Sequence, residues 1–328
     1  MKPTVNAKDV AKLAGVSQSS VSRVFFDGAK VTEKTRQKVL AAAQELGYRP
    51  NEYARSLITN STRIIGLVMK GIHNPFYPQV LKQFTTSFKK YGYSILFVHT
   101  NNDEIQNEDI ETLLNYNVAG VIITDATMSM NVAEAFKANH IPLVFFNRKL
   151  TTSDFYSVCC NNLNASRKIA EFLTARGEGP MVYISGNEDT STSREREQGF
   201  AEVLEQRGIP YQKYTSDFTY DGGYETARRM LSEGDAPAAV FAANDIMALG
   251  VIDALRKSGV KIPEQVKVVG FDNIDMASWP AYQLTTWEQP IDEMVDETVN
   301  YLLSEIDEYT GQAQAVEVEG SFVERSTT

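Results

Sequence analysis

Residues 17–25 read SQSSVSRVF, a short helical pattern in which two valines three positions apart lie on one face. Ser17 is a favoured N-cap residue, so we expect a helix from there through Val24. Another helix is predicted over residues 7–14, and Gly15 ends it because glycine readily adopts the left-handed conformation. Two helices joined by a short glycine-containing turn form a helix-turn-helix arrangement.

A third helix is predicted to follow Thr32, its cap, and to end before Gly47. Apolar residues at helical spacing are expected to pack the three helices together; these are Val10, Ala11, Leu13, Val21, Val24, Val39, Leu40, Ala43 and Leu46. The first fifty residues thus predict a small all-α domain.

The second helix keeps a polar face after its valines are packed, formed by Ser17, Gln18, Ser19, Ser22 and Arg23. Such short or hydrogen-bonding side chains can reach base edges in the major groove of DNA. The alternative is a three-helix bundle whose polar face meets only solvent.

Charge is distributed unevenly between the two parts of the chain. Residues 1–60 hold ten Lys or Arg against five Asp or Glu, a net charge of +5, in a protein of formal charge −10. The remaining residues therefore carry −15. A basic head on an acidic body indicates that only the head meets nucleic acid.

Composition bounds the class of protein. The 328 residues are 43% hydrophobic, enough for two or three domains, and no apolar run approaches the ~20 residues of a membrane span. The start of the sequence lacks a signal-peptide pattern, so a cytoplasmic location is expected. Cys159 and Cys160 are predicted to be buried and reduced, and the scattered histidines predict no metal site.

A further short helix is predicted over residues 52–58, with Asn51 as its cap. Two turns of helix are only marginally stable in water, so a surface or a second copy must order them. The segment carries Arg55 and an exposed Leu57, which a solvated linker would not need.

From residue 62 onward, apolar runs alternate with helical stretches. The runs are RIIGLVM, YSILFVH, VAGVIIT, IPLVFFN, YSVCC, MVYISG, AAVFAAN and VKVVGFD. This alternation predicts parallel sheets with helices on both faces, and about ten strands favour two such sheets.

Ligands of open parallel sheets bind at the carboxyl ends of the strands. The residues expected there are Lys70, Phe76, Tyr77, Asp125, Asn147, Arg148, the segment 187–196, Asn244, Asp245 and Asp272, with Phe218 and Trp287 available for stacking. Each polar residue alone is more often a helix cap than a ligand contact. Their convergence on one edge favours a cleft for a small molecule.

The head resembles that of bacterial regulators of the lac and purine repressor family, on the motifs DVAKLAGVSQSSVSRVF and VTEKTRQKVLAAAQELGYRPNEYARSL followed by RIIGLV. The resemblance implies that the short helix is a hinge helix, with Asn51, Ala54, Arg55 and Leu57 at the DNA. Leu57 would then wedge open a base step from the minor groove. Gln18 and Ser19 would select the half-site, and Arg23 would contact a base or phosphate.

The body is similar to periplasmic sugar-binding proteins, which implies two subdomains joined by three crossings that close over a ligand. HNPFYPQV would supply Phe76 as a stacking residue, and SREREQGF would supply Arg196 as a direct contact. FAANDIMALG would supply Asn244 as a contact and Asp245 as a helix cap. Asp272 in VVGFDN would bind paired hydroxyls, and LTTWEQP resembles a late crossing.

The expected organisation is a helix-turn-helix DNA-binding domain over residues 1–50, a hinge helix and linker over 51–61, and an effector-binding and dimerisation domain over 62–328. The last divides into an N-subdomain of about 62–161 plus 292–320 and a C-subdomain of about 162–291 plus 321–328. The fold class is thus an all-α head on an α/β body of two doubly wound parallel-sheet subdomains.

These features predict a transcription regulator of carbohydrate genes: a homodimer that binds a pseudo-palindromic double-stranded DNA operator and a sugar-like effector. Lys70 and Arg148 beside Arg196 suggest an effector with a carboxylate or phosphate. Alternatives are a nucleobase or a protein corepressor as the signal. Neither an enzyme nor a transport receptor is expected, because no catalytic motif or cofactor fingerprint is found and the basic head would have no role.

Overall fold

The computed structural model describes residues 5–25, 31–48, 62–70, 72–100, 105, 107–124, 130–149, 154–177, 179–188, 190–234 and 236–328. The chain forms two compact units, Met1–Thr62 and Arg63–Thr328.

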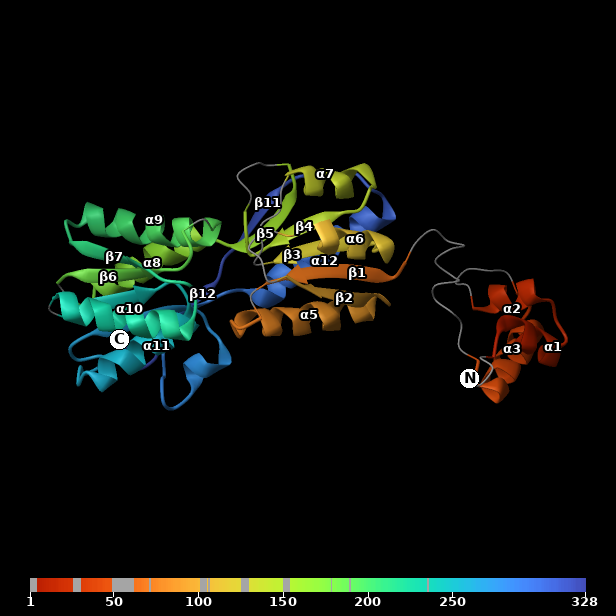
Figure 1. Cartoon of the computed structure of the whole chain (residues 1–328), viewed down its shortest axis with the longest axis horizontal. Coiled ribbons are helices and arrows are strands. Elements are labelled where there is room, and N and C mark those ends of the chain that lie inside the picture. The colour runs from red at the N-terminus through yellow and green to blue at the C-terminus, as the bar shows by residue number, and fades with distance from the viewer. Residues whose placement is uncertain are drawn as a thin grey trace. The chain divides into compact units, whose positions relative to one another are not determined.

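The first unit contains the three predicted helices, α1 (Ala7–Ala14), α2 (Gln18–Val24) and α3 (Glu33–Leu46). Ser17 caps α2 by accepting from the backbone N–H of Ser20 at 3.1 Å. Gly15 ends α1 and Gly47 ends α3, each at a φ of 64° in the left-handed region. These bounds confirm the predicted helix-turn-helix (Figure 1).

The core of this unit consists of Val10, Ala11, Ala14, Val21, Val24, Val39, Ala42 and Ala43. The prediction was wrong for Leu13 and Leu40, which are 46% and 45% exposed. Successive helical residues are about 100° apart. The buried stripe of α1 is centred near Ala14 and that of α3 near Val39, so both leucines fall outside it.

The second unit holds two six-stranded sheets (Figure 1). The first has the order β11-β5-β4-β3-β1-β2 and is parallel throughout; its strands are β1 (Ile64–Met69), β2 (Ser94–His99), β3 (Gly120–Thr124), β4 (Leu143–Phe146), β5 (Tyr156–Cys160) and β11 (Ala315–Val318). The second has the order β12-β10-β9-β8-β6-β7, with β6 (Met181–Ser185), β7 (Tyr211–Thr215), β8 (Ala239–Ala242), β9 (Lys267–Asp272), β10 (Thr285–Glu288) and β12 (Ser321–Val323). Only β12 is antiparallel to its neighbour among these pairs.

All eight predicted runs form strands, and the predicted pair of doubly wound sheets is confirmed. The four strands that the apolar runs did not reveal are β7, β10, β11 and β12. Three of them lie at sheet edges, where one side of the strand has no partner. Their sequences alternate or are polar, as in YQKYT, because only part of each strand is buried.

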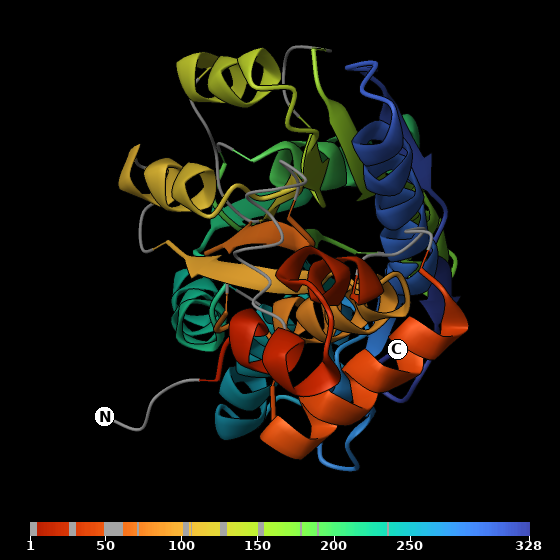
Figure 2. The ribbon, with the colours of Figure 1, turned by 90° about the vertical axis from the view of Figure 1, so that its right-hand side faces the viewer.

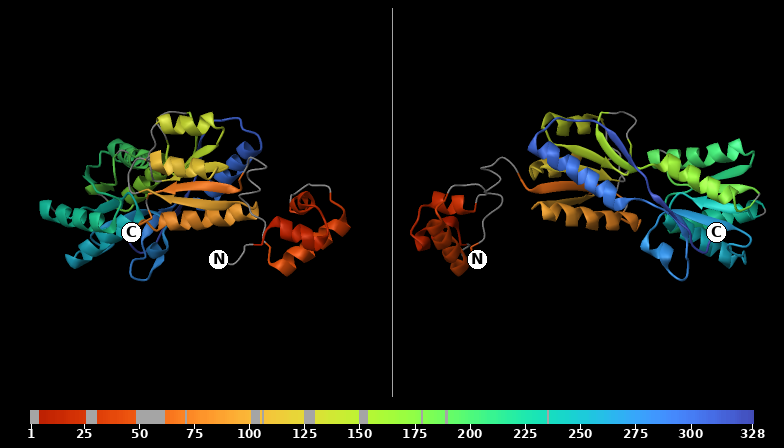
Figure 3. Two further views of the ribbon diagram at one scale, coloured as in Figure 1. Left: turned by 45° about the vertical axis from the view of Figure 1, so that its right-hand side comes forward. Right: turned by 180° about the vertical axis from the view of Figure 1, so that it is seen from behind.

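Helices cover both faces of each sheet. On the first sheet, α6 (Asn107–Asn115) and α7 (Met130–Ala138) pack on one face, and α5 (Phe76–Lys90) and α12 (Ile291–Asp307) lie side by side on the other (Figures 2 and 3). Alternate residues of one strand mark the two faces: Ile122 packs with the α5 side and Ile123 with the α6 side. On the second sheet, α8 (Asn162–Thr174) packs with α9 (Ser191–Gln206), and α10 (Tyr220–Glu233) with α11 (Asp245–Lys257).

The chain passes between the two sheets at three places, after β5, after β10 and after β11. The short helix η1 (Asp275–Ser278) follows β9. Cys159 and Cys160 lie in β5, free and buried as predicted, and burial raises the pKa of both thiols to about 12. Among the described helices, none combines the length and apolar character needed to cross a bilayer.

Candidate functional sites

The candidate DNA-reading surface is the outer face of α2. Gln18, Ser19 and Arg23 are exposed there, and Ser22 is half-buried. Ser17 contacts the hydroxyl groups of Ser19 and Ser20 at 2.8 and 2.9 Å, so its side chain is engaged in capping the helix. The predicted hinge-helix residues Asn51, Ala54, Arg55 and Leu57 lie outside the described residues, as does Asp125.

The candidate ligand site is a cavity of about 630 Å³ in the second unit, at the carboxyl ends of strands from both sheets. All nine predicted effector contacts that the structure describes line it: Lys70, Phe76, Tyr77, Asn147, Arg148, Arg196, Phe218, Asn244 and Asp272. They follow β1, β4, β7 and β8, end β9, or lie on α5 and α9. Parallel strands bring them together because their carboxyl ends share one edge.

Arg196 and Asp272 face each other in this cavity, at 3% and 4% exposure. The nearest guanidinium nitrogen is 4.0 Å from Asp272 Oδ1. Arg196 Nε donates to Asn162 Oδ1 at 2.8 Å, and the guanidinium carbon lies 3.5 Å from the centre of the Phe271 ring. Both charged groups are thus held in place before any ligand arrives.

Asp272 connects the two sheets of the unit. Its Oδ1 accepts from Gln289 Nε2 at 2.7 Å, and its Oδ2 accepts from Asn74 Nδ2 at 3.4 Å. Its φ of 120° is a conformation that L-residues rarely adopt. Such strain persists only where the surrounding contacts enforce it, and it clusters at binding sites.

A second network joins the sheets behind Arg196. Lys149, directly after Arg148, donates from Nζ to Glu195 Oε1 at 2.8 Å and also to Glu317. Glu195 Oε2 accepts from Asn162 Nδ2 at 3.4 Å, and Asn162 in turn holds Arg196. A chain of polar contacts therefore leads from the lysine to the cavity arginine.

The prediction that Asp245 caps the following helix was wrong, whereas Asn244 lines the cavity and also forms the cap. Asn244, and not Asp245, caps α11: its Oδ1 accepts from the N–H of Met247 at 3.0 Å, while Nδ2 donates to the carbonyl of Phe218 at 3.3 Å. Asp245 is fully buried and accepts from the Ile274 N–H at 2.9 Å and the Thr286 hydroxyl at 2.6 Å. Burial and then the charge of Asp272 raise the pKa of Asp245 to about 7.

This shift predicts a pH effect on stability. The pKa of Asp245 is higher in the folded protein than the ~3.9 of an unfolded chain, so its protonation stabilises the fold at low pH, and that contribution is lost as pH rises from about 4 to about 7. Relative to wild type, Asp245→Asn should therefore gain stability across this range and level off above it. Urea unfolding of both proteins at a series of pH values measures the difference, and a constant difference would contradict the assignment.

Aromatic residues on the cavity differ in placement. Phe218, at a φ of 62°, packs its ring directly on Gly186, where a Cβ atom would come within 2.1 Å of the ring. Phe76 is almost fully buried against Tyr77, with ring centres 5.2 Å apart. Trp287, predicted to be available for stacking, is buried and does not line the cavity, so that prediction was wrong.

Sequence reasoning missed part of the wall. Thr215 at the end of β7 and Ser216, Asp217 and Thr219 after it line the cavity; β7 is the polar edge strand that no apolar run indicated. The sequence does carry a signal for these residues. They lie between two helical patterns, directly before the capped start of α10, where a strand and its end are expected. Among the described residues, no group of three or more His, Cys, Asp or Glu could hold a metal ion.

Comparisons with known proteins agree with both units. Residues 6–51 match the model of bacterial regulatory proteins of the lacI family, and residues 65–278 match a periplasmic binding protein domain. The ribose operon repressor of Escherichia coli (strain K12) is 32% identical over 325 residues, 98% of each chain. The repressor PurR of Edwardsiella ictaluri is 32% identical over 324 residues, 97% of this chain and 95% of that one. A lac repressor dimer bound to operator and the anti-inducer ONPF has a TM-score of 0.88 at 28% identity, covering 99% of both chains.

A helix-turn-helix unit together with a two-sheet, cavity-bearing unit defines a DNA-binding regulator with a ligand-binding domain. The chain belongs to the lacI family of bacterial regulatory proteins and is a DNA-binding transcriptional repressor. The resemblance drawn from the sequence is confirmed, and the relatives named above are repressors rather than enzymes.

Proposed function

We propose that this repressor controls carbohydrate-metabolism genes and that a sugar or sugar derivative in the 630 Å³ cavity sets its affinity for the operator. The cytoplasmic protein binds a pseudo-palindromic operator as a homodimer, reading the major groove with Gln18, Ser19 and Arg23. The observation that carries the proposal is the buried Arg196–Asp272 pair facing a cavity. A carboxylate and a guanidinium together bind adjacent hydroxyl groups, since one accepts and the other donates.

Unpaired polar atoms in the cavity support a polyhydroxylated ligand. Asn147 Oδ1 and Ser216 Oγ are buried and have no hydrogen-bond partner among the described residues. Leaving a buried polar atom unpaired costs about 1–3 kcal/mol. Ligand hydroxyls would restore both bonds, because a hydroxyl can donate to the amide oxygen and either donate to or accept from the serine.

The names of the relatives suggest two classes of ligand, sugars and purines. One is named a ribose operon repressor and the other PurR, and a solved lacI-family regulator from Enterococcus faecium with bound ribose is 25% identical over 81% of this chain. A sugar is favoured by the hydroxyl-binding groups just described. A nucleobase, stacked on Phe218, is the alternative, and a protein corepressor remains the third.

The test is the melting temperature of the full chain with neutral sugars including ribose, sugar acids, sugar phosphates and nucleobases. A ligand at a hundred times its Kd stabilises the folded protein by ~2.7 kcal/mol, which raises Tm by several degrees. A sugar hit supports the proposal, whereas a hit confined to nucleobases replaces it. No shift with any compound would favour a protein signal.

The charge of the effector is tested by one substitution. Lys70, Arg148 and Arg196 line the cavity, so we propose that the sugar derivative carries a carboxylate or phosphate. Arg148→Ala should then weaken binding of such a compound about tenfold or more and leave a neutral sugar unaffected. Arg228→Ala, which removes an exposed arginine outside the cavity wall, is the matched control. Equal affinities for the acid in all three proteins would remove the charge argument.

A further inference from the structure

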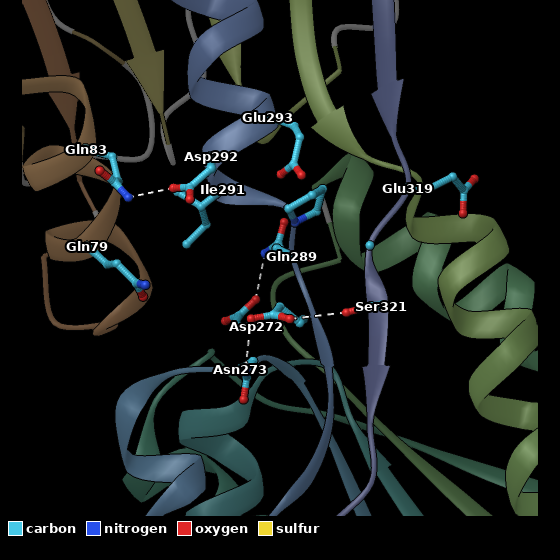
Figure 4. Close-up of a pocket in the computed structure, with 13 residues that line it drawn as sticks. Gln79, Gln83, Asp272, Asn273, Gln289, Ile291, Asp292, Glu293, Glu319 and Ser321 are labelled. Carbon is cyan, nitrogen blue, oxygen red and sulfur yellow. Dashed lines mark hydrogen bonds between the residues drawn. The ribbon is translucent and has the colours of Figure 1, made fainter. Parts of the chain in front are cut away.

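A second cavity, of about 400 Å³, lies where the chain crosses between the two sheets. Its wall combines the segment after β10, the segment after β11 and the start of α5 (Figure 4). Its polar wall includes Asp272, Glu288, Gln289, Asp292, Glu293 and Glu319. This crossing cavity is distinct from the ligand cavity, although Asp272 borders both.

The crossing cavity is strongly acidic. Among the described residues, its wall contains three glutamates and Asp292 besides Asp272, and neither lysine nor arginine. The contacts of two of these carboxylates come from neutral donors: Gln83 Nε2 to Asp292 Oδ1 at 2.6 Å, and Asn273 Nδ2 to Glu288 Oε1 at 3.0 Å (Figure 4). These amide donors orient Asp292 and Glu288 without neutralising them, whereas Asp272 faces Arg196 at 4.0 Å and Glu319 lies 3.6 Å from Lys168 Nζ.

Gln289 supplies an independent indication of a missing hydrogen-bond donor. Its side chain lines the crossing cavity at only 2% exposure. Nε2 must face Asp272, because an ionised carboxylate only accepts hydrogen bonds; the Nε2–Oδ1 distance is 2.7 Å. The amide oxygen is therefore fixed on the other side, where it has no partner among the described residues.

The spacing of the carboxylates in the crossing cavity favours an organic cation over a metal ion. No three acidic or other metal-binding side chains in the described part of the chain come close enough to hold a metal ion, which requires oxygens at about 2.0–2.6 Å. An aliphatic chain with ammonium groups at intervals can reach separate carboxylates instead, and each ammonium has three donors. One of them can satisfy the unpaired oxygen of Gln289.

We propose that the crossing cavity binds an aliphatic diamine or polyamine, whose ammonium groups pair with Glu293 and its neighbours and donate to Gln289 Oε1. Its 400 Å³ falls within the range of small-molecule sites, about 300–1,000 Å³. Because Gln289 also holds Asp272, a bound amine stabilises the arrangement of the ligand cavity. If the proposed function holds, amine and effector therefore alter each other's affinity by the same factor.

The test is titration of the full chain, without DNA, with spermidine, followed by calorimetry and by Tm. Spermidine should bind and raise Tm, while butane-1,4-diol and Mg²⁺ at matched ionic strength should not. Glu293→Gln removes one charge from the cavity wall without a described hydrogen bond being lost, and it should weaken spermidine binding about tenfold. Glu264→Gln, at an exposed position outside the wall, removes the same charge and should leave the affinity unchanged.

Two outcomes would overturn the proposal. Equal spermidine affinity in wild type, Glu293→Gln and Glu264→Gln would mean only diffuse attraction to an acidic protein. Stabilisation by Mg²⁺ equal to that by spermidine would replace the amine with a simple ion. Arg148 lines the ligand cavity and not the crossing cavity, so Arg148→Ala should retain spermidine binding; failure of the sugar proposal and failure of the amine proposal therefore give different results.

Discussion

Asp272→Asn should abolish the response to the effector while leaving operator binding intact. The substitution keeps the shape of the side chain, and asparagine tolerates the positive φ of 120° better than most residues. It removes the negative charge that faces Arg196 at 4.0 Å in a buried site. We expect effector affinity to fall about a hundredfold or more, since a buried, charge-assisted contact to the ligand is lost.

The measurement pairs two assays on one protein. The Tm shift with the compound identified in the ligand panel reports effector binding, and operator binding is measured with and without that compound. Asp275→Asn, three residues further on at an exposed position, is the matched control. An Asp272→Asn protein that still responds would move the effector site away from the Arg196–Asp272 pair.

Gly250→Ala should destabilise the second unit by about 2–3 kcal/mol. Gly250 lies in the middle of α11, and a Cβ atom there would be 2.1 Å from the carbonyl oxygen of Tyr220 in α10. Alanine has a helix propensity about 1 kcal/mol more favourable than that of glycine. The atom in the way, however, belongs to the backbone of α10, which cannot move aside as a flexible side chain can. The overpacking cost therefore wins, and Tm should fall by roughly 5 °C or more.

Gly234→Ala is the control for this substitution. Gly234 follows α10 with extended backbone, and nothing lies within 4 Å of a Cβ atom built there. Its stability should change by no more than ~0.5 kcal/mol. If Gly250→Ala is as stable as Gly234→Ala, then α10 and α11 are further apart at Gly250 than the structure shows.

Much of the ligand cavity could be predicted because it follows from the order of strands along the chain. Apolar runs locate the central strands, and the residue after each run must lie at the carboxyl edge of a parallel sheet. Lys70, Asn147 and Asn244 were found in this way. The three-helix head was equally accessible, since Ser17 and Gly15 mark helix ends by local backbone chemistry alone.

The rest depended on partners distant in sequence. Asn74 reaches Asp272 from 198 positions away, and Asn162 orients Arg196 from 34. Whether two such side chains meet depends on the register of the strands and the rotation of the helices. The hydrophobic pattern of a sequence determines both only to within about one residue. The same limitation explains Leu40, because one step of about 100° along a helix separates a core position from an exposed one.

The order in which the strands of the first sheet appear bears on how the protein is made. Cys159 in β5 and Val316 in β11 are in contact across 157 positions of chain, and every strand of the second sheet except β12 is synthesised between them. Until β11 emerges from the ribosome, β5 presents an open, apolar edge with no proline to block pairing. During translation the nascent protein therefore passes through a stage in which aggregation at this edge competes with completion of the fold.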